Sequence, residues 1–171
     1  PVVGACGTGH GVATLVAPST NLCSAGTASS VSTTAAAYTW NCAGLHGGAD
    51  SGMCSASRQY AVSPAVSGNG TITPATMQVV TYGQSASFTV TPASGHQIAS
   101  VSGCDGSLDT NNIWTTAAVQ AACTVSASFT SITTQTALPL PGGGTADVQV
   151  SGANCLIDNF SCILAPADQP P

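Results

Sequence analysis

Charged side chains are almost absent from this sequence. The 171 residues contain no Glu, no Lys, a single Arg (Arg58) and six Asp, so only 4% of the chain is charged, against about 25% in an ordinary soluble domain. There is no basic patch, which argues against nucleic-acid binding and against attraction to anionic membranes. A surface without charge of both signs is poorly protected against self-association. The composition therefore favours a protein that assembles with copies of itself or is anchored on a surface.

Helix formers, aromatic residues and long apolar runs are also scarce. Glu and Lys are missing, whereas 22 Thr and 21 Ser are present, a bias toward strands and turns. No run of 18 apolar residues occurs, so no membrane-spanning segment is expected. With 5% aromatic residues, the core has to come from Val, Ile, Leu and Ala. We predict an all-β protein made of small antiparallel domains.

Cysteine is the abundant exception. Eight are present: Cys6, Cys23, Cys42, Cys54, Cys104, Cys123, Cys155 and Cys162. An even number predicts four disulfides, which persist in an oxidising compartment. The chain begins at Pro1 rather than Met, which we interpret as removal of a secretory signal peptide. No Cys-x-x-Cys occurs, and the three His are scattered among glycines, so neither a structural zinc site nor c-type haem attachment is expected.

Three sections differ in composition. Residues 1–56 read as a disulfide-stapled β module with strands over 12–16 and 36–40. Residues 57–131 contain five to seven short strands, including 60–66, 71–73, 77–82, 86–90, 97–101 and 123–129, with turn residues between them. Residues 132–171 read as a linker, 133–144, followed by an arm with one alternating stretch, 146–150, and a stapled hairpin at Cys155 and Cys162.

The second section resembles a divergent internalin B-type repeat, a module of bacterial surface proteins. The resemblance rests on the ordered pieces Gly70-Thr-Ile-Thr-Pro74, Val80-Thr-Tyr-Gly83, Ala86-Ser-Phe-Thr-Val-Thr-Pro92, Gly95-His-Gln-Ile-Ala-Ser-Val101, Gly103-Cys104 and Ala122-Cys-Thr-Val-Ser-Ala-Ser-Phe129. It implies a small β-grasp-like, non-catalytic module with a spacer or adhesive role outside a bacterial cell. The pieces 4–7, 21–28 and 38–44, with Cys54, are similar to a cysteine-containing module found beside such repeats in exported bacterial proteins.

Disulfide pairing follows only in part. The resemblance implies a Cys104–Cys123 bridge, and Cys155–Cys162 is favoured as a local pair. The other four cysteines allow three pairings, of which we favour Cys6–Cys23 with Cys42–Cys54.

The residues for catalysis or metal binding are few. His10, His46 and His96 each flank a Gly, and no Gly-x-Ser-x-Gly elbow frames a nucleophile. Asp105 and Asp109 read as turn residues. Together with Asn111 and Asn112 they are also the best set of hard oxygen ligands for calcium, but no Glu closes the loop as in an EF-hand. We expect no enzyme activity, no cofactor and no metal.

Four aromatic residues leave a second hypothesis open. Tyr38, Trp40, Tyr82 and Trp114 are either core residues, the interpretation we favour, or a sugar-binding platform. The second case makes the protein a monomeric adhesin or carbohydrate-binding module with surface glycans as partners.

The leading hypothesis is a structural subunit of an extracellular filament or layer. In this hypothesis the partners are copies of the same chain, joined by β-strand addition. The donor strand we expect is Asp147, Val148, Gln149 and Val150, with Val2 and Val3 as the alternative donor.

Overall fold

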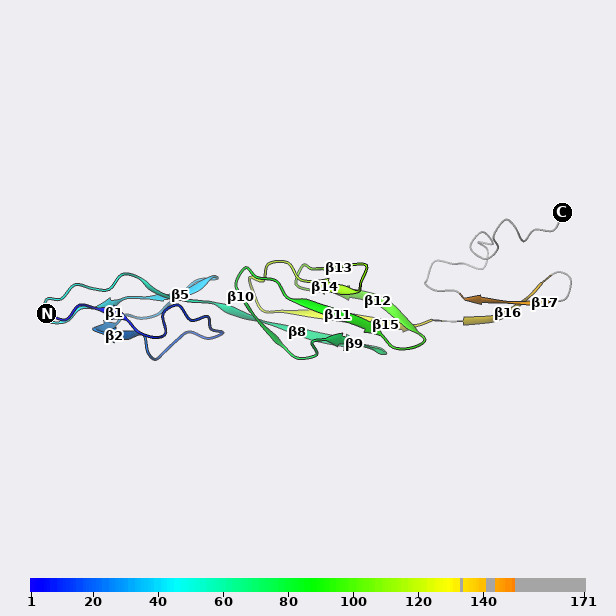
Figure 1. The fold of residues 1–171 in the computed structure, drawn as a ribbon, viewed down its shortest axis with the longest axis horizontal. Coiled ribbons are helices and arrows are strands. Elements are labelled where there is room, and N and C mark those ends of the chain that lie inside the picture. Colours follow the sequence, from blue (N-terminus) through cyan, green and yellow to red (C-terminus); the bar gives the residue numbers. More distant parts are fainter. Residues whose placement is uncertain (133, 141–143, 150–171) are drawn as a thin grey trace.

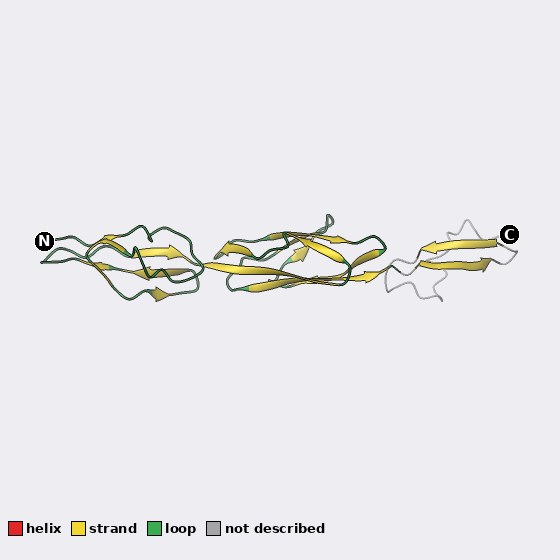
Figure 2. Ribbon diagram, turned by 90° about the horizontal axis from the view of Figure 1, so that it is seen from below, coloured by secondary structure: helices red, strands yellow, loops and turns green. Residues whose placement is uncertain are grey.

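The computed structural model describes residues 1–132, 134–140 and 144–149. All regular structure in this part of the chain is β, which confirms the predicted fold class (Figure 2). No helix long and apolar enough to cross a membrane occurs among the described residues. An N-terminal module, a two-sheet sandwich and a hairpin follow one another along the long axis, with Pro1 at one end (Figure 1).

The N-terminal module contains seven short strands in three small antiparallel sheets. They pair as β1–β2, β3–β6 and β4–β5–β7. Its small core is made of Tyr38, Trp40, Cys42, Cys54 and Ala56. The strands are β1 (Ala5–Cys6), β2 (Cys23–Ala25), β3 (Thr27–Ala28), β4 (Ser32–Thr33), β5 (Ala37–Trp40), β6 (Cys42–Ala43) and β7 (Cys54–Ser57).

The sandwich consists of two four-stranded sheets, in the orders β10-β8-β15-β12 and β13-β14-β11-β9. Its neighbouring strands are antiparallel except for β8 and β15, the first and last, which run parallel side by side. The strands are β8 (Gln59–Ser67), β9 (Gly70–Thr73), β10 (Gln78–Thr81), β11 (Ser87–Pro92), β12 (His96–Ser102), β13 (Ser107–Leu108), β14 (Ile113–Thr115) and β15 (Cys123–Ser131).

Alternation of apolar and polar residues builds the core of the sandwich. In β11, Phe88 and Val90 are buried while their neighbours Ser87, Thr89 and Thr91 are exposed. Strands with this period of two place every second residue inside. Both sheets contribute to one cluster, formed by Val62, Ile72, Val80, Phe88, Val90, Trp114, Val119, Val125, Ala127 and Phe129.

The segment 12–16 is not the strand that its apolar residues predict. It is a loop that follows the edge of β7, where the backbone N–H groups of Gly11 and Thr14 donate to the carbonyls of Ser55 and Ser57. Val12 and Val16 are exposed. The stretch therefore covers an edge instead of filling a core.

Two further strands follow the sandwich, β16 (Thr134–Leu140) and β17 (Gly144–Gln149), which pair with each other as an antiparallel hairpin. Composition predicted a linker over 133–144, and β16 corrects this in part. A Thr-rich stretch pairs readily when a partner strand follows. The strand expected at 146–150 matches β17, which contains Asp147, Val148 and Gln149. Val150, Cys155 and Cys162 lie outside the described residues.

Candidate functional site

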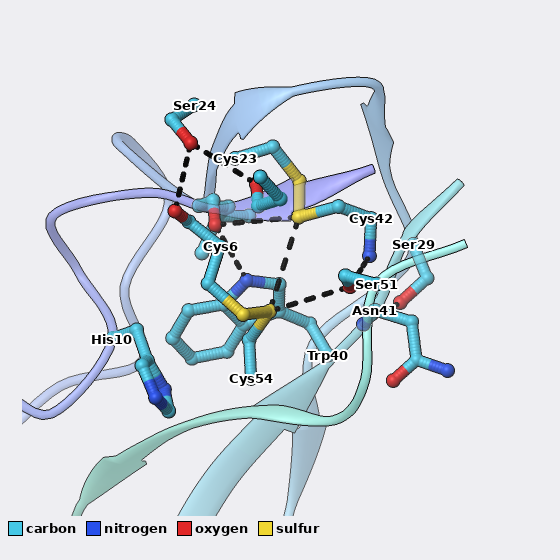
Figure 3. Close-up of a disulfide and its surroundings, with 12 residues drawn as sticks. Cys6, His10, Cys23, Ser24, Ser29, Trp40, Asn41, Cys42, Ser51 and Cys54 are labelled. Atoms are coloured by element: carbon cyan, nitrogen blue, oxygen red, sulfur yellow. Dashed lines mark hydrogen bonds between the residues drawn. A yellow bond between two sulfur atoms is a disulfide. The ribbon is translucent and has the colours of Figure 1, made fainter. Parts of the chain in front are cut away.

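Two disulfides cross the N-terminal module, Cys6–Cys54 and Cys23–Cys42 (Figure 3). The favoured pairing of Cys6 with Cys23 and of Cys42 with Cys54 is therefore wrong. Cys6 and Cys23 lie opposite each other on β1 and β2, but each bonds to a cysteine of the second half of the module. Nearness in sequence does not reveal this nested pairing. The third described bridge, Cys104–Cys123, confirms the prediction.

The two nested bridges matter for a module with so small a core. In the chain-entropy view, the bridges with sequence separations of 48 and 19 residues stabilise the fold by about 4 and about 3 kcal/mol. The fully buried Cys42 and Cys54 sulfurs lie 3.9 Å apart. Trp40 packs in the same cluster and donates from Nε1 to the carbonyl of Leu22 at 2.7 Å. Buried cysteine sulfurs and Trp40 thus form a large part of the interior of this module, together with Tyr38 and Ala56.

Two of the three histidines, His10 and His96, make structural hydrogen bonds. The backbone N–H of Ser55 donates to Nδ1 of His10 at 2.9 Å, so this ring covers the outer edge of β7. His96 lies 3.0 Å through Nε2 from Asn69 Nδ2 and 3.1 Å through Nδ1 from the Ser94 carbonyl. His46 occupies a turn with a positive φ of 53°. Among the described residues, no hydrogen bond joins a histidine to a carboxylate, as an acid–base pair would require.

Asp109 is a turn residue, as predicted. Its Oδ1 accepts the backbone N–H groups of Asn111 at 2.9 Å and of Ile113 at 2.8 Å. The hydrogen bond from Ile113, followed by those from Asn111, holds the pKa of the Asp109 carboxyl below its ordinary value. Both carboxylate oxygens of Asp109, one of the four residues considered as calcium ligands, are thus directed at N–H donors. Within the described residues, no three Cys, His, Asp or Glu side chains gather as a metal ion would require.

An open pocket of about 410 Å³ lies beside the Cys104–Cys123 bridge. Asp105 and Gln120 are the polar side chains in its lining, and the rest is cystine, alanine and Val119. No histidine lines it. The pocket therefore offers no nucleophile with a base beside it.

Three of the four aromatic residues fill cores, which confirms the favoured interpretation for Tyr38, Trp40 and Trp114. Tyr38, Trp40 and Trp114 are only 4%, 3% and 6% exposed. Tyr82 is partly buried. A flat sugar-binding platform needs exposed rings, and the described residues do not present these four in that way.

Rows of hydroxyl groups cover both outer faces of the sandwich. On one sheet, Thr71 and Thr73 of β9 lie opposite Thr91 and Thr89 of β11, and all four are exposed. On the other sheet, Ser100 of β12 lies opposite Ser128 of β15, with their oxygens 2.7 Å apart. These hydroxyl groups allow both outer faces to be hydrated although neither face carries charged side chains.

The strand edges are equally uncharged. No Asp, Glu, Lys or Arg occurs in any strand from β1 to β16, and β17 contains one, Asp147. Most edge strands of natural proteins carry charges, bulges or prolines that prevent pairing with another chain. Here β9 and β10 are short, with four residues each, and β12 contains a bulge between Ile98 and Ser100.

The only cation of the chain lies at the junction of the two modules. Arg58 separates β7 from β8, and its guanidinium carbon lies 5.6 Å from the ring centre of Tyr38 and 4.9 Å from that of Tyr60. Nη1 of Arg58 donates to the Thr34 carbonyl at 2.9 Å, and the Tyr60 hydroxyl donates to the Ala35 carbonyl at 2.8 Å. These contacts join the first module to the first strand of the sandwich.

The backbone reinforces this junction. The N–H of Arg58 donates to the Ala36 carbonyl, and the Arg58 carbonyl accepts the N–H of Tyr82, both at 2.8–2.9 Å. Sequence reasoning missed this role of Arg58. The one available signal was that the single cation stands at the predicted domain boundary.

Comparison with known families adds one result. Residues 60–133 match the divergent InlB B-repeat domain. The InlB B-type repeat coincides with the sandwich β8–β15 and confirms the predicted resemblance for this section. It belongs to a family of bacterial cell-surface domains, and the disulfides fit an extracellular protein. For the cysteine-containing N-terminal module, the disulfides are consistent with the second resemblance. Neither the curated proteins nor the solved structures gave a match.

Proposed function

We propose that this chain is a secreted, non-catalytic structural subunit of a bacterial extracellular filament or layer, and that copies join by β-strand addition. The observation that carries the proposal is the absence of charge from strands β1 to β16. Edge strands present unpaired N–H and C=O groups, and charge is the usual protection against pairing with another chain.

The C-terminal hairpin is the donor in this proposal. An isolated two-stranded hairpin is marginally stable in water, and β16 and β17 pair only with each other in the described part of the chain. The alternative donor, Val2-Val3, is less suitable because Val2 already exchanges two backbone hydrogen bonds with Leu45. A head-to-tail contact between a hairpin and an edge on another copy does not close on itself and therefore produces a fibre or layer.

Negative-stain microscopy of the native material tests the proposal. Filaments or sheets are the expected result, and deletion of residues 137–171 should abolish them. Material that stays a compact single copy at high concentration, or a deletion variant that assembles unchanged, contradicts the proposal. Glycan binding by a monomer would support the adhesin hypothesis instead. That hypothesis requires exposed aromatic rings, and Tyr38, Trp40 and Trp114 are buried.

A further inference from the structure

We infer that strand β12 is the acceptor edge, and that it takes β17 of a second copy. This inference rests on the proposed function and names the surface at which the copies would meet. Four strands lie at the outer edges of the two sandwich sheets: β9, β10, β12 and β13. Each leaves one side of its backbone without a neighbouring strand, so length, pairing and side chains decide between them.

Length favours β12. It has seven residues, whereas β9 and β10 have four each and β13 has two. The donor β17 has six residues. Each residue pair in an added strand contributes backbone hydrogen bonds. Of the four edge strands, only β12 is long enough to pair with all six residues of β17.

The backbone of β12 is also free on its outer side. Apart from the ladder to β15, none of the backbone hydrogen bonds found among the described residues involves residues 97–102. The bulge at Ala99 is the single protective feature of this edge, and it interrupts the ladder at one position. Neither proline nor a charged side chain occurs between His96 and Ser102.

The side-chain pattern of β12 suits an added strand. Ile98 and Val101 pack against the core, while Ser100 and Ser102 are exposed beside the hydroxyl groups of β15. The donor sequence Thr145-Ala-Asp-Val-Gln149 also alternates polar and apolar residues. Strand addition in one register would therefore continue the polar face of this sheet with Thr145, Asp147 and Gln149, and its apolar face with Ala146 and Val148.

Two lysine variants of the 171-residue chain separate β12 from the opposite edge of the same sheet. Ala99→Lys places a charge on an exposed residue of β12, and Val79→Lys does the same on β10, where Val79 is 43% exposed. We expect Ala99→Lys to raise the protein concentration needed for assembly by about tenfold or more, because Lys on an edge strand opposes pairing. Val79→Lys should assemble like the unmodified chain.

Hydrogen exchange gives a second readout that does not depend on a substitution. Assembly of the unmodified chain should slow exchange of the amides of 97–102 and leave those of β9 and β10 unchanged. Normal assembly of Ala99→Lys together with unprotected β12 amides would overturn the choice of β12 while leaving strand addition intact. Failure of the unmodified chain to assemble would instead remove the proposed function, on which this inference rests.

Discussion

At the scale of single residues, one cation has a role that charge counting does not reveal. The guanidinium of Arg58 lies against two tyrosine rings and donates to a backbone carbonyl, an arrangement that suits its planar, weakly hydrated head group. The chain has no Lys and no second Arg. Its one cationic side chain thus connects the N-terminal module to the sandwich and does not serve as a solvated surface charge.

Replacing Arg58 should therefore loosen the junction. Arg58→Lys keeps the charge but loses the planar group, and we expect a loss of about 1–2 kcal/mol in the free energy of unfolding. Urea unfolding followed by circular dichroism measures it. Tyr60→Phe, which removes only the hydroxyl donor to Ala35, should cost about 1 kcal/mol. Unchanged midpoints in both variants would show that the Arg58 guanidinium and the Tyr60 hydroxyl do not stabilise the junction.

Asp109 is the residue for which we expect a local pH dependence. Its folded-state pKa is lowered, first by the hydrogen bond from Ile113. The carboxylate therefore stabilises the turn above the unfolded-state pKa of about 3.9, and this contribution is lost as the pH falls through the lower folded-state value. A carbon-detected NMR titration should give a midpoint below about 3.9. Asp109→Asn, which keeps an oxygen acceptor, should hold the turn at all pH values, whereas Asp109→Ala should not.

At the scale of elements, close packing between strands sets the tolerance to substitution. Gly70 begins β9, and a Cβ atom there would come within 2.4–2.5 Å of the Phe129 ring of β15. The ring is 8% exposed and belongs to the core cluster, so it has little room to move.

Gly70→Ala should therefore destabilise the sandwich by about 1–3 kcal/mol through overpacking. Gly52→Ala is the matched control, since a Cβ atom at Gly52 meets nothing within 4 Å, and its midpoint should stay within about 0.5 kcal/mol of the unmodified chain. Thermal unfolding of both variants compares them directly. An equal effect of the two substitutions would show that the contact with Phe129 is not limiting.

Most long strands of the sandwich could be predicted from the sequence, because their alternation is local information. Predicted stretches such as 86–90 and 123–129 correspond to β11 and β15. The two-residue strands, and β14 with three residues, are too short to show an alternation of apolar and polar residues. They could therefore not be predicted from the sequence. The nested disulfides could not be predicted, because the strand pairing that brings Cys6 to Cys54 and Cys23 to Cys42 is tertiary structure.

At the scale of the whole molecule, the low charge sets the response to solution conditions. The described strands other than β17 are uncharged, and Arg58 interacts with rings and a carbonyl rather than with a carboxylate. Stability should therefore depend little on screening.

Raising the salt concentration from about 0.01 M to about 1 M shortens the Debye length from about 30 Å to about 3 Å. We expect the free energy of unfolding in urea to change by less than about 1 kcal/mol, the upper range for an exposed ion pair. Urea is the appropriate denaturant because it adds no ions. A larger change would show that the six carboxylates contribute substantially to the stability of the fold.

The parallel pairing of β8 and β15 has a mechanical consequence. These strands carry the chain into and out of the sandwich, and six residue pairs from Cys123↔Val62 to Ser128↔Ser67 join them. Tension along the polypeptide pulls the start of β8 and the end of β15 in opposite directions. The load thus falls on all these rungs together as shear, instead of opening them one by one. A chain built in this way would resist stretching far better than its modest core implies.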